Sequence, residues 1–320
     1  MRIKTAMGIA LTAAVVLTGC QRAEAQDYPS GPVTMTAGAN PGSGFDLTIR
    51  GVVEALQQDK IVEVALPIQN RPGASGADFL ATMVEQYRGH DDQISVTSLS
   101  IMVNKLRGQS DYGYPDVTMI ARLMTEYYVV VTRPDSPLNT LGEVMAAIAA
   151  DPGSVTVGAA NDDQAPFDLL VAAAGGDPSS VGYVGFEGGG DQIAALRDGT
   201  IDVAIGGVSE FVDLLSDREL QGLGVLAEQR LPGLDVPTAA EQGFDVTLSN
   251  WRGLYGPPDM PPTAVTYWQQ ALQTMVATPA WQRIAERSGF TTTFMTGAEF
   301  EGFLAETQAD VEEALAEAGR

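Results

Sequence analysis

Cysteine, histidine and positive charge are all scarce in this chain. Its 320 residues include one cysteine, Cys20, and one histidine, His90. A lone cysteine excludes an intramolecular disulfide, and because Cys20 lies in an apolar N-terminal segment, no thiolate metal cluster or catalytic cysteine is expected in the folded part. His90 sits in a polar stretch typical of a solvated turn, and a multi-histidine centre needs a second histidine. The sequence therefore predicts neither a metal site nor a cofactor.

Basic residues are outnumbered by acidic ones. Lys and Arg total 18 against 41 Asp and Glu, which gives a formal net charge of -23. This charge excludes nucleic acid as a partner, since the phosphate backbone would be repelled. Most of it is typical of a solvated acidic surface. Its field also repels anionic ligands, so a site for an anion must depend on local hydrogen-bond donors.

Familiar catalytic motifs are missing from the sequence. Ser209 lies in GVSEF (207–211), which lacks the closing glycine of a nucleophile elbow. The GLGVLA segment at 222–227 has the spacing of a dinucleotide fingerprint, but it is itself predicted to be a strand rather than the turn after one. These motifs therefore mark out no catalytic constellation. An acid/base hydrolase using Asp162 and Asp163 stays open as an alternative.

The N-terminus is typical of an export signal. Arg2 and Lys4 precede an uncharged apolar run over residues 5–21, which is too short and too poorly flanked for a membrane span. Residues 1–25 contain two processing patterns: LTGC at 17–20, in which Cys20 would be lipidated, and AEA at 23–25, after which ordinary cleavage would occur. We favour lipidation. Both routes predict that the chain crosses a membrane, and in the first case it would stay tethered to that membrane through Cys20.

Hydrophobic periodicity predicts an α/β fold with mostly parallel sheets flanked by helices. Short β-branched runs alternate with longer amphipathic ones, and Gly, Pro and Asp stand at the joins. Strands are predicted at 33–37, 61–66, 94–99, 127–132, 155–159, 181–184, 201–205 and 222–227. Helices are predicted at 45–58, 140–150, 165–174, 191–198, 263–274, 279–288 and 298–318.

Three predicted strand-to-helix loops are rich in small residues. They lie at 40–46, 160–164 and 186–191, where glycines allow backbone N–H groups to approach a ligand and the following helix N-terminus favours an anion. Helix capping is the alternative, with Ser43 and Asp46 as a capping box and Asp162 and Asp163 as caps of the second helix. The two roles are compatible. Three loops of one kind predict convergent amide donors for a carboxylate.

Six motifs together resemble the substrate-binding receptors of tripartite tricarboxylate transporters, the Bug receptors. The resemblance extends from about residue 28 to the C-terminus. The segments RLPGLDVPT at 230–238, NWRG at 250–253 and SEF at 209–211 are together most similar to the tricarboxylate branch. The motifs are YPS at 28–30, PGSG at 41–44 followed by Asp46, NRPGASG at 70–76, FEGGG at 186–190, RLPGLDVPT at 230–238 and NWRG at 250–253.

This resemblance implies a two-domain periplasmic binding protein of type II, the Venus-flytrap fold. The first domain would comprise residues 26–125 and 251–320, and the second residues 126–250. The protein would be a monomer, and not an enzyme, that captures a small organic carboxylate, such as a di- or tricarboxylate, and delivers it to membrane permease subunits. A receptor for a sensor kinase is an alternative.

The resemblance also implies which residues bind the ligand. The loops would close over a carboxylate through backbone amides and small hydroxyl side chains, while NRPG at 70–73 is structural and Trp251 and Arg252 pack near the hinge. The implied ligand-binding residues are Asn40, Pro41, Gly42, Ser43, Gly44, Asp46, Ser98, Ala160, Asn161, Asp162, Asp163, Gln164, Phe186, Glu187, Gly188 and Gly189.

One departure from the tricarboxylate branch bears on the ligand. That branch usually carries a Gly- and Ser-rich loop ending in Thr-Asp-His where this chain has ANDDQA at 160–165. Two like charges about 4 Å apart repel by roughly 4 kcal/mol at an effective dielectric near 20, which disfavours a citrate trianion. Three explanations stay open: the aspartates are caps, the ligand is less anionic or carries an amine, or a divalent cation bridges protein and ligand.

Overall fold

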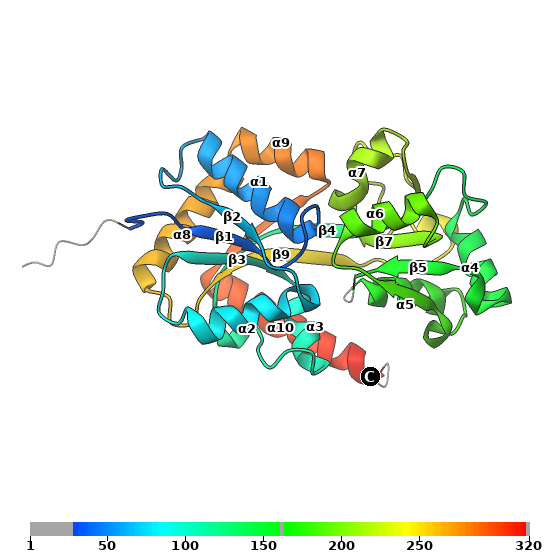
Figure 1. Ribbon diagram of the computed structural model, residues 1–320, viewed down its shortest axis with the longest axis horizontal. Helices are drawn as coiled ribbons and strands as arrows, with labels where there is room; N and C mark the ends of the chain where they lie inside the picture. Colours follow the sequence, from blue (N-terminus) through cyan, green and yellow to red (C-terminus); the bar gives the residue numbers. More distant parts are fainter. Residues whose placement is uncertain (1–27, 161–162, 318–320) are drawn as a thin grey trace, which may run out of the picture.

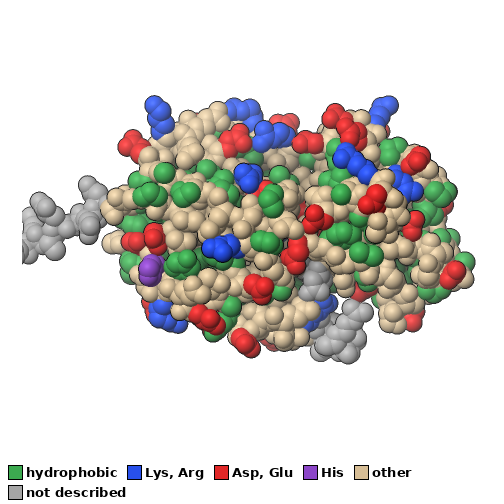
Figure 2. Space-filling view, viewed as in Figure 1, with side chains coloured by type: hydrophobic (Ala, Val, Ile, Leu, Met, Phe, Trp, Pro, Cys, Tyr) green, Lys and Arg blue, Asp and Glu red, His purple; other side chains and the backbone are tan. Residues whose placement is uncertain are grey.

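The computed structural model describes residues 28–160 and 163–317. The predicted signal segment with Cys20, and the candidate residues Asn161 and Asp162, lie outside the described residues. Within those two ranges, none of the helices is both long enough and apolar enough to span a bilayer. Acidic side chains are spread over both halves of the molecule, interspersed with Lys and Arg on the face that Figure 2 shows.

The first domain is a sheet covered by helices on both faces (Figure 1). Its parallel strands are β1 (Thr34–Ala37), β2 (Ile68–Asn70) and β3 (Gln93–Ser98). Apolar side chains of α1 (Gly44–Gln58), α8 (Pro262–Val276) and α9 (Pro279–Ser288) form the core on one face. The core on the other face involves α2 (Ala77–Gln86), α3 (Ser100–Leu106) and α10 (Gly297–Glu317).

The second domain repeats this layered arrangement. Its parallel strands are β5 (Thr156–Ala159), β6 (Gly182–Gly185) and β7 (Val203–Gly207). One face of the sheet is covered by α4 (Leu141–Ala150) and α5 (Gln164–Ala173), and the other by α6 (Gly189–Asp198) and α7 (Val208–Ser216). Each face therefore has an apolar core of its own.

Two long strands connect the domains. β4 (Thr118–Thr132) pairs with β9 (Ser249–Gly256) over its first part and with β7 and β8 (Gln221–Val225) over its last five residues, all antiparallel. β9 also pairs with β3, and β10 (Thr291–Thr296) with β4. In the described part of the chain these pairings join ten strands into one sheet.

The structure confirms the α/β class and the flanking helices, and it refines the pairing. Parallel pairs lie toward the outside of the sheet, whereas the central strands are antiparallel because the chain crosses between the domains in both directions through β4 and β9. The strand predicted at 61–66 is wrong. Val62 and Leu66 are buried there, but the segment makes few ladder bonds, and the paired strand begins only after Pro67, at Ile68.

Several elements were not predicted from the pattern. They are the helices α2, α3 and α7, the strands β9 and β10, and the first half of β4. β9 contains Asn250, Arg252 and two glycines, so its sequence lacks the β-branched character of a typical strand. It is a strand because both of its edges are paired, by β3 and β4.

Candidate functional site

The loop between β1 and α1 meets the second domain. Gly42 has a φ of 82°, the left-handed conformation that favours glycine, and it turns the chain into the helix. Ser43 is the N-cap of α1 and its Oγ accepts a hydrogen bond from the Asp46 amide at 3.3 Å. Across the domain boundary, Asn40 Nδ2 donates to Asp191 Oδ2 on α6 at 2.9 Å. Two predicted loops, 40–46 and 186–191, are thereby brought together.

Asp46 is a structural residue of the first loop. Its carboxylate accepts hydrogen bonds from the Gly42 amide at 2.9 Å, from Arg50 Nε at 2.8 Å and from Asn70 Nδ2 at 3.0 Å. Burial raises the pKa of Asp46, but these hydrogen bonds outweigh it, so the pKa lies below its usual range. Asn70 also donates to the Ala39 carbonyl at 2.9 Å, in keeping with the structural role predicted for residues 70–73.

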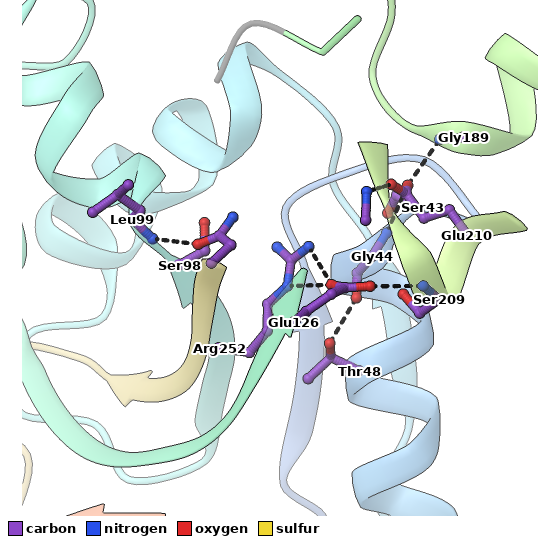
Figure 3. A network of polar contacts seen from close by, with 12 residues as sticks. Ser43, Gly44, Thr48, Ser98, Leu99, Glu126, Gly189, Ser209, Glu210 and Arg252 are labelled. Atoms are coloured by element: carbon purple, nitrogen blue, oxygen red, sulfur yellow. Dashed lines mark hydrogen bonds and ion pairs between the residues drawn. The ribbon is translucent and has the colours of Figure 1, made fainter. Parts of the chain in front are cut away.

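Glu210 of α7 accepts hydrogen bonds from backbone amides that were predicted to bind a ligand. Its Oε1 accepts hydrogen bonds from the Gly44 amide at 2.9 Å and the Gly189 amide at 2.8 Å (Figure 3). Its Oε2 accepts from the Gly207 amide at 3.1 Å. Gly44 begins α1 in the first domain, whereas Gly189 begins α6 in the second. One carboxylate of the protein therefore joins both domains.

A buried ion pair lies beside Glu210. Arg252 Nη2 on β9 is 2.9 Å from Glu126 Oε2 on β4, and the side chains are 8% and 1% exposed. Glu126 Oε1 also accepts from the Ser209 amide at 2.8 Å, which connects the hinge strands to α7. The Arg252 guanidinium lies 5.1 Å from the centre of the Phe45 ring. These contacts hold Arg252 on the strands that connect the domains, where its side chain is buried.

The charges of this cluster perturb each other. Burial, together with the negative charge of Glu126, raises the pKa of the Glu210 carboxyl to about 6, against the opposing effect of the Gly189 and Gly44 amides and of Arg252. Burial lowers the pKa of Arg252. The negative charges of Glu126 and Glu210 raise it by more than burial lowers it, so the pKa lies above its usual range. Arg252 is therefore always charged, and its charge is shared by two carboxylates.

A cavity of about 40 Å³ lies between the loops of the two domains. A space of that size holds a few water molecules. Its walls combine polar groups from the first domain, the second domain and the hinge cluster. They include Ser43, Gly44 and Ser75 from the first domain, Ala160, Asp163, Glu187, Gly188 and Glu210 from the second, and Arg252.

The remaining described site residues do not line this cavity. Pro41 lies close to the start of α6. A Cβ added to Gly190 there would be 3.3 Å from the Pro41 carbonyl oxygen. Gln164 is the first residue of α5, and Phe186 packs into the core of the second domain. Ser98 is buried, and its hydroxyl accepts from the Ser100 amide at 3.2 Å. Ser98 therefore lies beneath the start of α3 and does not line the cavity.

A larger groove opens on the other side of the hinge. Its volume is about 950 Å³, and it runs between α3 and α10 of the first domain and α5 of the second. Its walls are mainly apolar and include Leu99, Pro166, Leu169, Trp251 and Phe303. None of the predicted loop glycines lines it.

Sequence reasoning missed Ser75, Glu126 and the role of Glu210. SEF and NWRG were recognised as motifs, so the sequence already marked Glu210 and Arg252 without showing what they do. The signal for Glu126 was a charged residue directly before the apolar run 127–132. In the described ranges, no group of three or more His, Cys, Asp or Glu side chains is arranged to hold a metal ion.

The sequence profile of the Tripartite tricarboxylate transporter family receptors matches residues 49–319. The chain belongs to this receptor family. The predicted family is therefore confirmed, and with it a solute-binding receptor of the periplasmic-binding-protein type. Among curated relatives, the UPF0065 protein in gbd 5'region of Cupriavidus necator is 23% identical over 303 residues, which span 93% of this chain and 91% of that protein.

Solved structures of similar receptors share the two-domain fold. MatC of Rhodopseudomonas palustris, solved with bound malate, has a TM-score of 0.79 and 20% identity, and the match covers 89% of this chain and 99% of that one. Rpa4515 of R. palustris, solved with adipate, has a TM-score of 0.81 and 17% identity, over 92% and 99% of the two chains. The receptor fold is thus shared at low sequence identity.

Proposed function

We propose that this receptor captures a small organic carboxylate between its two domains outside the cytoplasm and delivers it to the permease subunits of a tripartite tricarboxylate transporter. The observation that carries the proposal is the polar cavity whose walls come from loops of both domains. A ligand held between these loops would stabilise the closed form, because it would contact both domains at once. MatC with malate and Rpa4515 with adipate support a small carboxylate as the ligand.

The proposal includes the domain boundaries and the site residues. Residues 26–125 with 251–320, and residues 126–250, would rotate against each other about β4 and β9 as a monomeric, non-catalytic receptor. Ligand contact would come from Ser43, Gly188, Asp163 and their neighbours in the loops 40–46, 160–164 and 186–189. The amides of Gly44 and Gly189 bind Glu210 in this structure, so their proposed role is to shape the site.

A thermal-shift screen tests the proposed ligand class. Mono-, di- and tricarboxylates, amino acids and aromatic acids are added to ligand-free protein, with and without calcium or magnesium. A true ligand at one hundred times its Kd adds about 2.7 kcal/mol of stability, which raises Tm by a few degrees. An increase that requires the divalent cation would indicate a bridging ion. No increase with any compound would remove the main support for carboxylate capture.

We also propose export with lipid attachment at Cys20. Tyr28 is anchored to the first domain, since its hydroxyl donates to the Asp91 carbonyl at 2.7 Å and accepts from Trp268 Nε1 at 2.6 Å. A chain processed at Cys20 would have a tether of about seven residues before Tyr28, which spans at most roughly 25 Å. Intact mass of the mature protein is expected to show a diacylglyceryl adduct on Cys20. An unmodified start at Gln26 would contradict the tether.

A further inference from the structure

Glu210 is bound in the way that a receptor binds the carboxylate of a ligand. Its two oxygens accept three backbone hydrogen bonds of 2.8–3.1 Å, all from glycines: Gly44, Gly189 and Gly207. Two of these amides begin α1 and α6, and a helix N-terminus attracts negative charge through its free N–H groups and its dipole. The anion-binding position formed by the N-termini of α1 and α6 is therefore filled by a carboxylate of the chain itself.

The glycines around this carboxylate are required by close packing. A Cβ on Gly189 would lie 2.6 Å from Glu210 Cβ, and one on Gly206 would lie 2.9 Å from Glu210 Oε2. A Cβ on Gly44 would lie within 2.4 Å of Arg252 Nη2, and one on Gly207 would lie 2.5 Å from Glu126 Oε1. Real Cβ atoms essentially never approach other atoms so closely. Only glycine therefore fits at these four positions around the charged cluster.

Arg50 and Arg252, which lie beside the loops, are already paired with carboxylates. Arg252 is shared by Glu126 and Glu210, so this cluster is negative by one charge. From α1, Asp46 is held by Arg50, and from α6, Asp191 accepts a hydrogen bond from Asn40.

The cavity itself adds further negative charge. Asp163 and Glu187 contribute two more carboxylates to its walls, and Glu187 Oε2 is buried without a hydrogen-bond partner in the described part of the chain. The site is thus negative on several sides.

We propose that Glu210 is a positioning residue that stands in for a ligand carboxylate at the N-termini of α1 and α6, holding the two loops together and restricting the cleft to ligands of low net negative charge. This rests on the proposed receptor function. The preferred class is then monocarboxylates and zwitterionic amino acids. A second ligand carboxylate about 4 Å from Glu210 would weaken binding on the order of a hundredfold or more.

Nuclear magnetic resonance of the ¹⁵N-glycine-labelled protein tests the positioning role directly. Because burial raises the pKa of Glu210 to about 6, the amide signals of Gly44, Gly189 and Gly207 are expected to shift together between pH 5 and 7 with a midpoint near that value. Glu210→Gln is expected to abolish the shared titration. Asp213→Asn, on the exposed face of the same helix, should leave it intact.

Three glycine signals that titrate separately, or a titration that survives Glu210→Gln, would overturn the proposal. The wild-type titration decides the question even if the variant does not fold.

Calorimetry with matched ligands tests the charge restriction. A monocarboxylate, the dicarboxylate of the same chain length and the corresponding amino acid are titrated into wild type and Glu210→Gln. Wild type is expected to prefer the two singly anionic or zwitterionic compounds at least tenfold, and the variant to lose most of that preference. A wild-type preference for the dicarboxylate would reject the charge restriction while leaving carboxylate capture standing. Binding of none of them would reject carboxylate capture, and the glycine titration would still decide the position of Glu210.

Discussion

Replacing Arg252 with methionine is expected to lower the free energy of unfolding by about 3–5 kcal/mol. The substitution keeps the apolar part of the side chain but removes the charge that both Glu126 and Glu210 face. Glu126 is 1% exposed, so its carboxylate cannot recover solvation from water. Breaking one partner of a buried ion pair leaves an uncompensated charge in a medium of low dielectric, which explains the size of the effect. Urea denaturation followed by circular dichroism measures it.

The loss of unfolding free energy in Arg252→Met is expected to be smaller at acidic pH. Arg252 opposes the rise in the pKa of Glu210, so removing it raises that pKa further above the value in the unfolded chain. A carboxyl with a raised folded pKa contributes stability at low pH that is lost as pH rises, so the deficit is expected to be larger at pH 7 than at pH 5.

A surface ion pair provides the control for Arg252. Arg287→Met removes an exposed arginine that lies 3.5 Å from Glu54, and it should cost less than about 1 kcal/mol. Equal losses for the two variants would contradict the importance of the buried cluster.

Gly188→Ala is expected to weaken ligand binding on the order of 30-fold. Gly188 has a φ of 141°, and a Cβ at this position would lie 2.5 Å from Ser43 Cβ of the first domain. The backbone strain of about 1 kcal/mol is local to residue 188 and is present in the open and closed forms alike. The overlap with Ser43, costing about 2 kcal/mol, acts in the closed form because the collision is between domains. At 1.4 kcal/mol per factor of ten, the overlap corresponds to roughly a 30-fold change in Kd. Isothermal titration with a ligand from the screen measures it.

A neighbouring glycine separates closure from general damage. Gly185 ends β6 three residues earlier, is exposed, and has no atom within 4 Å of its potential Cβ. Gly185→Ala should therefore bind like wild type. Gly188→Ala should also keep most of its unfolding free energy, since the open form relieves the overlap. Wild-type affinity in Gly188→Ala would show that the two loops do not approach in the bound state.

Much of the local structure was predictable because it depends on short-range physics. Ser43 was recognisable as a cap from its place before an amphipathic run. Of the two hydrogen bonds of the predicted capping box, only the one accepted by Ser43 is formed. Ser43 accepts from the Asp46 amide as expected, but the Asp46 carboxylate returns to Gly42 and binds Arg50 and Asn70 as well. Burial of that carboxylate depends on partners that local spacing does not show.

The candidate site was predictable in its loops but not in its charges. The loops 40–46 and 186–191 follow strands whose ends meet at the domain boundary, and glycine content marks them in the sequence. Glu126, Glu210 and Arg252 are distant from one another along the chain: 126 residues separate Glu126 from Arg252, and 166 separate Gly44 from Glu210. No periodicity or spacing rule joins groups so far apart.

The sequence alone determined the alternation of strands and helices, the receptor family, and the glycine-rich loops, since these follow from periodicity, turn chemistry and motif order. Only the tertiary structure decided what the glycine amides bind. Two antiparallel hinge strands bring Glu126 and Arg252 together beneath α7, and α7 presents Glu210 to helix N-termini of both domains. Burial makes those charges interact strongly, and burial is a property of the folded chain and not of any segment within it.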